Sequence, residues 1–122
     1  MKGVNVYPEN GHSIVAVIRR KPGMTLEEFH YHYKNIHAPL SAQLPGLLSY
    51  RQHPTRKPGQ GDGQYMPDEL LYDAVSIYIF ESAAAAEAAW LSPEGLLLDE
   101  DTVKFIDTDT QIILPVIPRQ VV

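Results

Sequence analysis

The chain has 122 residues, of which 44% are hydrophobic and 20% are charged, and it contains no cysteine. This length and balance predict one globular domain spanning residues 1–122, and the missing thiols exclude disulfides, zinc–thiolate sites and cysteine nucleophiles. A net charge of −5 without a basic stripe argues against a nucleic-acid partner. No apolar run reaches the ~18 residues that a bilayer span requires, and no secretory signal stands at the start, so we expect a cytoplasmic protein with no membrane partner.

The first half of the chain predicts a strand, a helix and a second strand. Residues 12–19 are rich in β-branched side chains and predict a strand that ends at a Pro-Gly turn. Thr25 followed by Glu28 is the signature of a capping box, which predicts a helix from Leu26 to about Leu40. Residues 46–53 predict the second strand.

The second half begins with a long loop. Residues 54–69 hold three prolines and three glycines, and a loop of this length often lines a site or an interface. Beyond it we expect a strand, a Ser82-capped alanine-rich helix, another helix and a last strand, at residues 72–80, 82–91, 94–106 and 108–114. Pro115 and Pro118 are expected to make the tail poor at sheet pairing.

The element order is β-α-β, loop, β-α-β, which is the split βαβ of a ferredoxin-like α+β fold. It predicts a four-stranded antiparallel sheet with helices on one face. Along the third strand, Val75, Ile77 and Ile79 alternate with Ala74 and Tyr78, so both faces of the strand are largely apolar. A face without helices is normally polar unless something covers it, and we therefore expect a homodimer that packs through the sheet.

Histidines are the candidates for chemistry, and three of the five lie in the first predicted helix. At about 100° per residue, Phe29 and Tyr33 mark an apolar stripe, with His30 and His37 on one edge and His32 on the other. A histidine at such an edge can face a cavity and transfer protons near neutral pH, or it can be half-buried and bonded to a backbone carbonyl. The spacing of these histidines does not predict a metal site, because two metal-binding histidines on one helix are normally four residues apart.

Other polar groups leave two interpretations open. The Tyr33 hydroxyl lies within the apolar stripe and is either core filler or a hydrogen-bond donor to a substrate. Asp73 lies among apolar strand residues: if it is buried it needs a partner such as a histidine, and at the solvent edge of the strand it has no significance. We favour the edge position for Asp73, and we expect the acidic run at residues 99–101 to be a solvated face.

Residues 18–53 resemble the EthD family, whose signature is a strand ending in Arg-Lys, a Pro-Gly turn and a helix with spaced aromatic and histidine residues. The matching positions here are Phe29, Tyr33, His37, Pro39, Leu44-Pro45-Gly46 and Tyr50. In the second half they are Tyr72-Asp73, Phe80, Trp90, Ser92-Pro93-Glu94-Gly95, Asp101 and Phe105. The resemblance covers residues 14–117, and one departure is that Tyr33 replaces the family's usual tryptophan.

The resemblance implies a dimeric α/β barrel, in which two ferredoxin-like subunits pack sheet to sheet. In catalytic barrels of this kind, a histidine moves protons on a hydrophobic ring substrate held between sheet and helices, and His37 matches the family's histidine. Our leading hypothesis is a cofactor-independent lyase, cyclase or isomerase of the dehydratase type, acting on an aromatic polyketide-like or lactone-like substrate. His37 would be the general base, Tyr33 would donate a hydrogen bond to the enolate, and His30 or Asp73 would orient or return the proton. Expected substrate contacts are Phe29, Tyr78, Trp90 and His53.

Other hypotheses remain open at this point. A cofactor-free monooxygenase would let the anion of a phenolic substrate activate oxygen, and a non-catalytic ligand carrier or accessory protein would bind a hydrophobic ligand without turnover. A heme version of the barrel is a further alternative, although no histidine can be singled out as its axial ligand. The leading hypothesis requires no cofactor, because the chain has no glycine-rich phosphate loop and no metal-ligand spacing.

Overall fold

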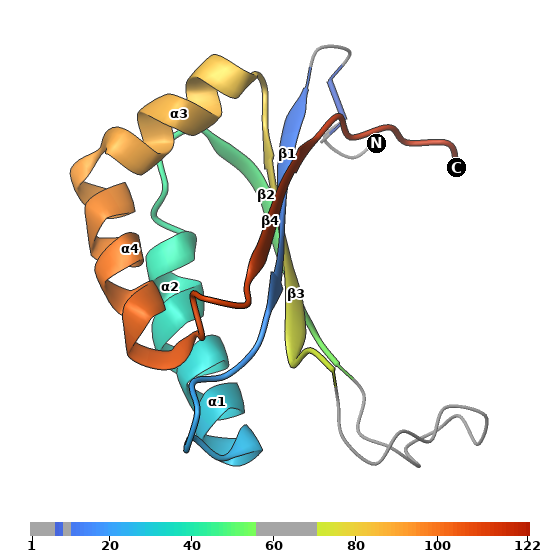
Figure 1. The fold of residues 1–122 in the computed structure, drawn as a ribbon. Coiled ribbons are helices and arrows are strands. Elements are labelled where there is room, and N and C mark those ends of the chain that lie inside the picture. The colour runs from blue at the N-terminus through green and yellow to red at the C-terminus, as the bar shows by residue number, and fades with distance from the viewer. Residues whose placement is uncertain (1–6, 9–10, 56–70) are drawn as a thin grey trace.

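A computed structural model describes residues 7–8, 11–55 and 71–122 of the chain (Figure 1). Its strands are β1 (His12–Ile18), β2 (Leu47–Pro54), β3 (Ala74–Phe80) and β4 (Ile112–Val116). Its helical segments are α1 (Leu26–His32), the π-helical turn η1 (Tyr33–His37), α2 (Ala38–Ser41), α3 (Ala83–Leu91) and α4 (Pro93–Phe105). Apart from Pro54 and Thr55, the loop expected at residues 54–69 lies outside the described residues.

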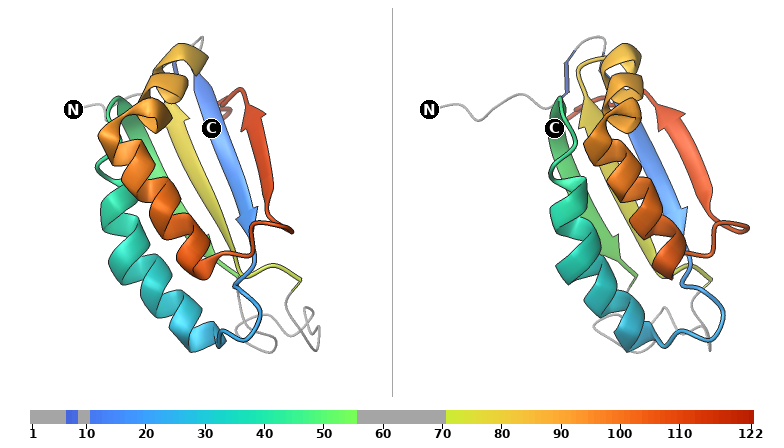
Figure 2. Two further views of the ribbon diagram at one scale, coloured as in Figure 1. Left: turned by 60° about the vertical axis from the view of Figure 1, so that its left-hand side comes forward. Right: turned by 90° about the vertical axis from the view of Figure 1, so that its left-hand side faces the viewer.

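The four strands form one antiparallel sheet in the order β2-β3-β1-β4, and the helices cover one of its faces (Figures 1 and 2). The predicted ferredoxin-like fold is confirmed. In the central pair, Ile14 of β1 lies opposite Tyr78 of β3. Because side chains alternate along a strand, Ser76 and Tyr78 face the helices, whereas Val75 and Ile77 face the other way.

Polar caps set the starts of the helices. Glu28 N–H donates to Thr25 Oγ1 at 3.1 Å, and Thr25 N–H donates to Glu28 Oε1 at 2.9 Å, so the predicted capping box is confirmed. Ser92 caps α4 by accepting from the Gly95 N–H at 3.1 Å. A Cβ atom at Gly95 would lie 2.4 Å from the Ala89 carbonyl oxygen, so glycine is needed where the chain turns from α3 into α4.

The first helical segment is not one regular α-helix. In η1 the Ala38 N–H donates to the Tyr33 carbonyl five residues earlier, which is the bond of a π-helix. Gln52 of β2 donates from Nε2 to the same carbonyl at 2.8 Å. The extra residue in this turn rotates everything after it relative to α1, so positions derived from uniform α-helical spacing are wrong from η1 onwards.

The last strand also differs from its expected position. A turn occupies the residues before it, where the Thr110 and Gln111 N–H groups donate to the Asp107 carbonyl at 3.3 and 3.2 Å, and β4 therefore begins at Ile112 instead of residue 108. Pro115 lies within β4, opposite Ile14, although we expected this proline to make the tail poor at sheet pairing. An edge strand tolerates proline, because only one of its sides has to donate to the sheet.

The core lies between the helices and the sheet. Phe29, Tyr33 and Phe105 pack on Ile18 in one cluster, and a second cluster surrounds Phe80. On the opposite face of the sheet, apolar side chains of β4 remain open to solvent, with Leu114 48% exposed. Among the described residues, no helix is both long and apolar enough to cross a membrane.

Candidate active site

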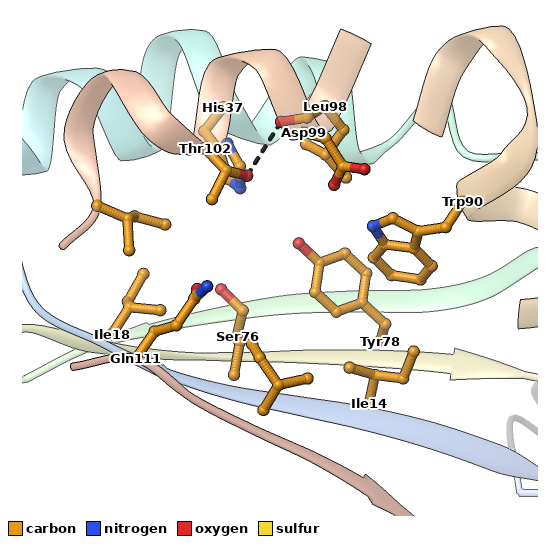
Figure 3. A pocket seen from close by; sticks show the side chains of 13 residues that line it. Ile14, Ile18, His37, Ser76, Tyr78, Trp90, Leu98, Asp99, Thr102 and Gln111 are labelled. Atoms are coloured by element: carbon orange, nitrogen blue, oxygen red, sulfur yellow. Dashed lines mark hydrogen bonds between the residues drawn. The ribbon is translucent and has the colours of Figure 1, made fainter. Parts of the chain in front are cut away.

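A cavity of about 340 Å³ lies between the helical layer and the sheet, bounded by η1, α3, α4, β1, β3 and β4 (Figure 3). Its walls are mostly apolar and include Ile14, Ala16, Ile18 and Leu98. Seven lining residues carry polar groups: His37, Ser76, Tyr78, Trp90, Asp99, Thr102 and Gln111. An apolar chamber with a few polar groups is typical of a site for a small molecule, and its size falls in the lower part of the range of roughly 300–1,000 Å³ found for such pockets.

His37 is a buried titratable group in this wall. Its side chain is 3% exposed, and Nδ1 lies 2.9 Å from Oδ2 of Asp101, a residue of α4 that is itself 2% exposed. A carboxylate accepts from Nδ1–H, and this bond favours the tautomer whose lone pair is on Nε2. Nε2 is then the nitrogen that can act on a molecule in the cavity. Burial lowers the pKa of His37 below its ordinary 6.5, although the hydrogen bond and charge of Asp101 oppose that shift.

The same carboxylate holds a second histidine. His32 Nε2 lies 2.8 Å from Oδ1 of Asp101, and the His32 ring stacks on Phe105 with centroids 4.4 Å apart. In a uniform α-helix, residues five apart point about 140° away from each other. The π-helical turn between His32 and His37 removes most of that angle and lets both rings reach one aspartate.

Tyr33 does not line this cavity. It is 1% exposed, its hydroxyl lies 2.6 Å from Ser76 Oγ and 3.3 Å from the Val75 carbonyl oxygen, and its ring packs in the core. Burial raises the pKa of Tyr33 well above its ordinary value. Ser76 does line the cavity, so Tyr33 supports a cavity residue and is not itself placed to donate to a substrate.

His30 and Asp73 are not brought to His37 as expected. His30 lines a separate pocket with Lys34 and Gln52, because the π-helical turn separates its direction from that of His37. Asp73 is 3% exposed, so its expected position at the solvent edge is wrong. Its partner is not a histidine: Arg20 donates to Asp73 from Nη1 and from the backbone N–H, both at 2.7 Å. This bond joins the C-terminal end of β1 to the start of β3 and gives Asp73 a structural role.

The four expected substrate contacts divide into two pairs. Tyr78 and Trp90 line the cavity and meet edge to face, with ring centroids 5.1 Å apart. Burial raises the pKa of Tyr78 well above its ordinary value, so its hydroxyl keeps its proton. Phe29 instead stacks on Tyr33 inside the core, and His53 is exposed on β2 away from the cavity lining.

Asp101 matches the family pattern, but the sequence gives it no role in the site. The expectation that residues 99–101 form a solvated face is wrong for Asp101, because α4 points it inward. A signal was present: Leu98 and Phe105 are three residues before and four residues after Asp101, which is the spacing of one buried helical stripe. A carboxylate on such a stripe needs a partner.

The residues matching the EthD domain are 21–109, well over half of the chain. The chain belongs to the EthD family. Its fold is similar to that of an EthD family protein from Bacillus halodurans C-125, with a TM-score of 0.70 and 18% identity over 89% of this chain and 99% of that one. Among curated proteins, none has a significant match to this sequence.

Two further solved structures have the same fold. A dimeric ferredoxin-like protein of unknown function from Thermobifida fusca YX gives a TM-score of 0.69 and 14% identity over 96% of this chain and 100% of that chain. The hydroxynitrile lyase of Passiflora edulis gives 0.65 and 13% identity over 94% of this chain and 99% of the lyase. At identities this low, the structural similarity establishes only the fold of the EthD protein. Its chemistry has to be argued from the geometry of the site.

Proposed function

We propose that this EthD protein is a cofactor-independent acid–base enzyme that removes a proton next to a carbonyl group of a small hydrophobic ring substrate. The reaction class would be that of a lyase, cyclase or isomerase, including dehydration. One observation carries the proposal: a buried histidine, oriented at Nδ1 by a buried aspartate, lines an apolar cavity with its other nitrogen available.

The geometry supports a simple sequence of proton transfers. Nε2 of His37 takes a proton from the carbon next to the carbonyl. The electron pair of that C–H bond forms a C=C bond, and the π pair of the C=O bond moves onto the oxygen to give an enolate. Asp101 stabilises the imidazolium that results, because it already accepts from Nδ1–H. In a dehydration the enolate re-forms its C=O bond, a double bond forms to the next carbon, and the C–O bond there breaks as His37 gives its proton to the leaving hydroxyl group, which departs as water. In an isomerisation His37 gives the proton to another carbon of the enolate system as the C=O bond re-forms. Either way His37 ends in its starting state.

The enolate needs a hydrogen-bond donor. Tyr78 takes the role first expected of Tyr33, because its hydroxyl points into the cavity from β3 (Figure 3). Ser76 lies two residues along the same strand face and offers a second hydroxyl. Donors fixed in a cavity with apolar walls stabilise developing charge more strongly than water does, since they need no reorganisation during the reaction.

A homodimer is part of this proposal. Alternation along the strands puts Val15, Ile77 and Leu114 side by side on the face that no described helix covers, in register across β3, β1 and β4. Burying such a face against a second copy would remove a broad apolar surface from water. Light scattering should give a mass twice the 13.7 kDa of the chain. A Leu114→Glu variant should give the monomer, while Glu100→Ala, on the opposite side of the molecule, should not.

Deuterium exchange tests the chemistry without knowledge of the natural substrate. The probes are 2-tetralone and 3-isochromanone, a bicyclic ketone and a bicyclic lactone with acidic C–H bonds next to the carbonyl. We expect the protein to speed their exchange with D₂O, followed by proton NMR, and His37→Asn to reduce the rate by roughly 10²-fold or more. His53→Asn is the matched control, because His53 is exposed and outside the cavity lining.

The outcomes separate the alternative functions. Binding of both probes without faster exchange would contradict the proposal and favour a ligand carrier. Oxygen uptake with a dihydroxynaphthalene that persists in His37→Asn would favour a cofactor-free monooxygenase. Exchange no faster than that produced by free imidazole at the same concentration would also count against the proposal.

A further inference from the structure

A second polar group lies in the cavity wall apart from the His37–Asp101 pair. Asp99 lines the cavity from α4 and is exposed, which places it at the mouth. Trp90 lines the same end of the cavity (Figure 3), and the indole N–H is the only donor of its side chain. Figure 3 shows Asp99 and Trp90 together toward one end of the cavity and Gln111 toward the other.

The acceptors and charges of this mouth restrict what can bind there. Of the described residues that line the cavity, none is lysine or arginine. Partial burial raises the pKa of Asp99, so water hydrates this carboxylate less than a fully exposed one. A carboxylate has several acceptor positions that a donor of a ligand can use.

We propose that Asp99 and Trp90 form a specificity subsite that accepts a hydrogen bond from a hydroxyl group of an uncharged ring substrate. This inference rests on the proposed function only for identifying the cavity as the substrate site. Such a subsite selects a phenol-like or hydroxylated ring over two other classes of ligand, plain lactones and carboxylic acids. A plain lactone offers only acceptors to Asp99, and a carboxylic acid would bring a second negative charge into apolar walls without a cation beside it.

Three naphthalenes of one ring size test the selection: 2-naphthol donates a hydrogen bond, 2-methoxynaphthalene cannot, and 2-naphthoate is an anion. Calorimetry gives their affinities. Trp90 is the only tryptophan of the chain, so the single indole N–H peak in a ¹H–¹⁵N spectrum reports binding at the subsite. We expect 2-naphthol to bind roughly tenfold more tightly than its methyl ether, the value of one hydrogen bond to a charged group, and 2-naphthoate to bind most weakly.

Two alanine variants provide the comparison. Asp99→Ala should abolish the preference for 2-naphthol over the ether and should move the free indole peak. Glu100→Ala removes the same charge from the neighbouring exposed residue, which does not line the cavity, and should keep the preference. Both sites are exposed positions of α4, where alanine favours the helix, so both variants should fold.

Equal affinities for 2-naphthol and its ether in the unmodified protein would overturn the inference, as would an Asp99→Ala variant that behaves like Glu100→Ala. The exchange test of the proposed function uses 2-tetralone with the unmodified protein, and 2-tetralone has no hydroxyl group from which Asp99 could accept. The proposed function can therefore survive the failure of this subsite. If none of the three naphthalenes binds, the assignment of the cavity as a site for ring substrates is wrong, and both proposals are contradicted.

Discussion

Two buried aspartates in this protein have nearly the same exposure and opposite uses. Asp73 is 3% exposed and accepts two bonds from Arg20, while Asp101 is 2% exposed and accepts from His32 and His37. Each is a buried carboxylate with its oxygens occupied. The difference lies in the partners: Arg20 gives its donors to a junction between strands, whereas His37 keeps one nitrogen that faces a cavity. Burial and pairing therefore do not separate the two carboxylates, and our proposal for Asp101 rests on the nitrogen that its partner His37 keeps toward the cavity.

The Asp101→Asn variant tests the difference between the two aspartates most directly. The amide can donate to His37 Nδ1 and so favour the tautomer with the lone pair at the wrong nitrogen. We expect probe exchange to fall by roughly 10²–10⁴-fold, as an aspartate that orients a general base can contribute that much. A loss of less than threefold would show that Asp101 is as structural as Asp73. The fold is checked by the near-ultraviolet circular dichroism of the variant.

Asp73→Asn should give the reverse pattern. Removing the charge that Arg20 meets leaves buried donors with a weaker acceptor, and we expect the free energy of unfolding to fall by about 1–3 kcal/mol. Because Arg20 is partly exposed, water replaces some of the lost interaction. Urea unfolding measures the loss. The exchange rate per folded molecule should stay within about twofold of the starting protein, and a larger drop would place Asp73 in the catalytic machinery.

Much of the fold, and part of the site, could be predicted from sequence. Capping by Thr25 and the alternation in β3 are local patterns, and they indicate the elements directly. The π-helical turn is not local, because Gln52 on a different element donates to the carbonyl of Tyr33. His37 was found through its family match, but its direction could not follow from uniform helical spacing. Asp101 matches the family pattern, but its pairing with His37 could not be predicted, because adjacent acidic residues look alike in sequence until the packing of α4 separates them.

The acid side of the pH dependence depends on His37. Its pKa is lowered below 6.5 in the folded protein, so the unfolded chain binds this proton more tightly. The stabilisation from keeping His37 neutral is full above about pH 6.5 and is lost as the pH falls from there through the lower folded value. The slope from one such group is at most about 1.4 kcal/mol per pH unit. Urea unfolding from pH 7.5 to 4.5 should show a shallower decline for His37→Asn than for the unmodified protein; identical slopes would contradict a depressed pKa.

The smallest effect expected is that of His32, which shares Asp101 with the base but does not line the cavity. Positive charge on His32 lowers the pKa of His37, and its Nε2–H draws on the carboxylate that stabilises the imidazolium. His32→Phe removes both influences and keeps an aromatic ring to stack on Phe105. The groups that then still face His37 are Asp101, the Tyr33 ring stacked beside it, Asp99 in the same helical wall and Tyr78 across the cavity on the sheet (Figure 3).

We therefore expect the pKa of His37 to rise in His32→Phe, followed by NMR titration of its ring, and the acid limb of probe exchange to move to higher pH by the same amount. The rate on the plateau should change by less than about threefold, because His37 keeps its bond to Asp101. His53→Phe is the control for adding a phenyl ring at an exposed histidine and should shift neither quantity. A plateau loss as large as that of Asp101→Asn would mean that the two histidines and the aspartate work as one unit. An unmoved titration would mean that Asp101 serves His37 alone, and that His32 is held by the same kind of structural bond that Arg20 makes to Asp73.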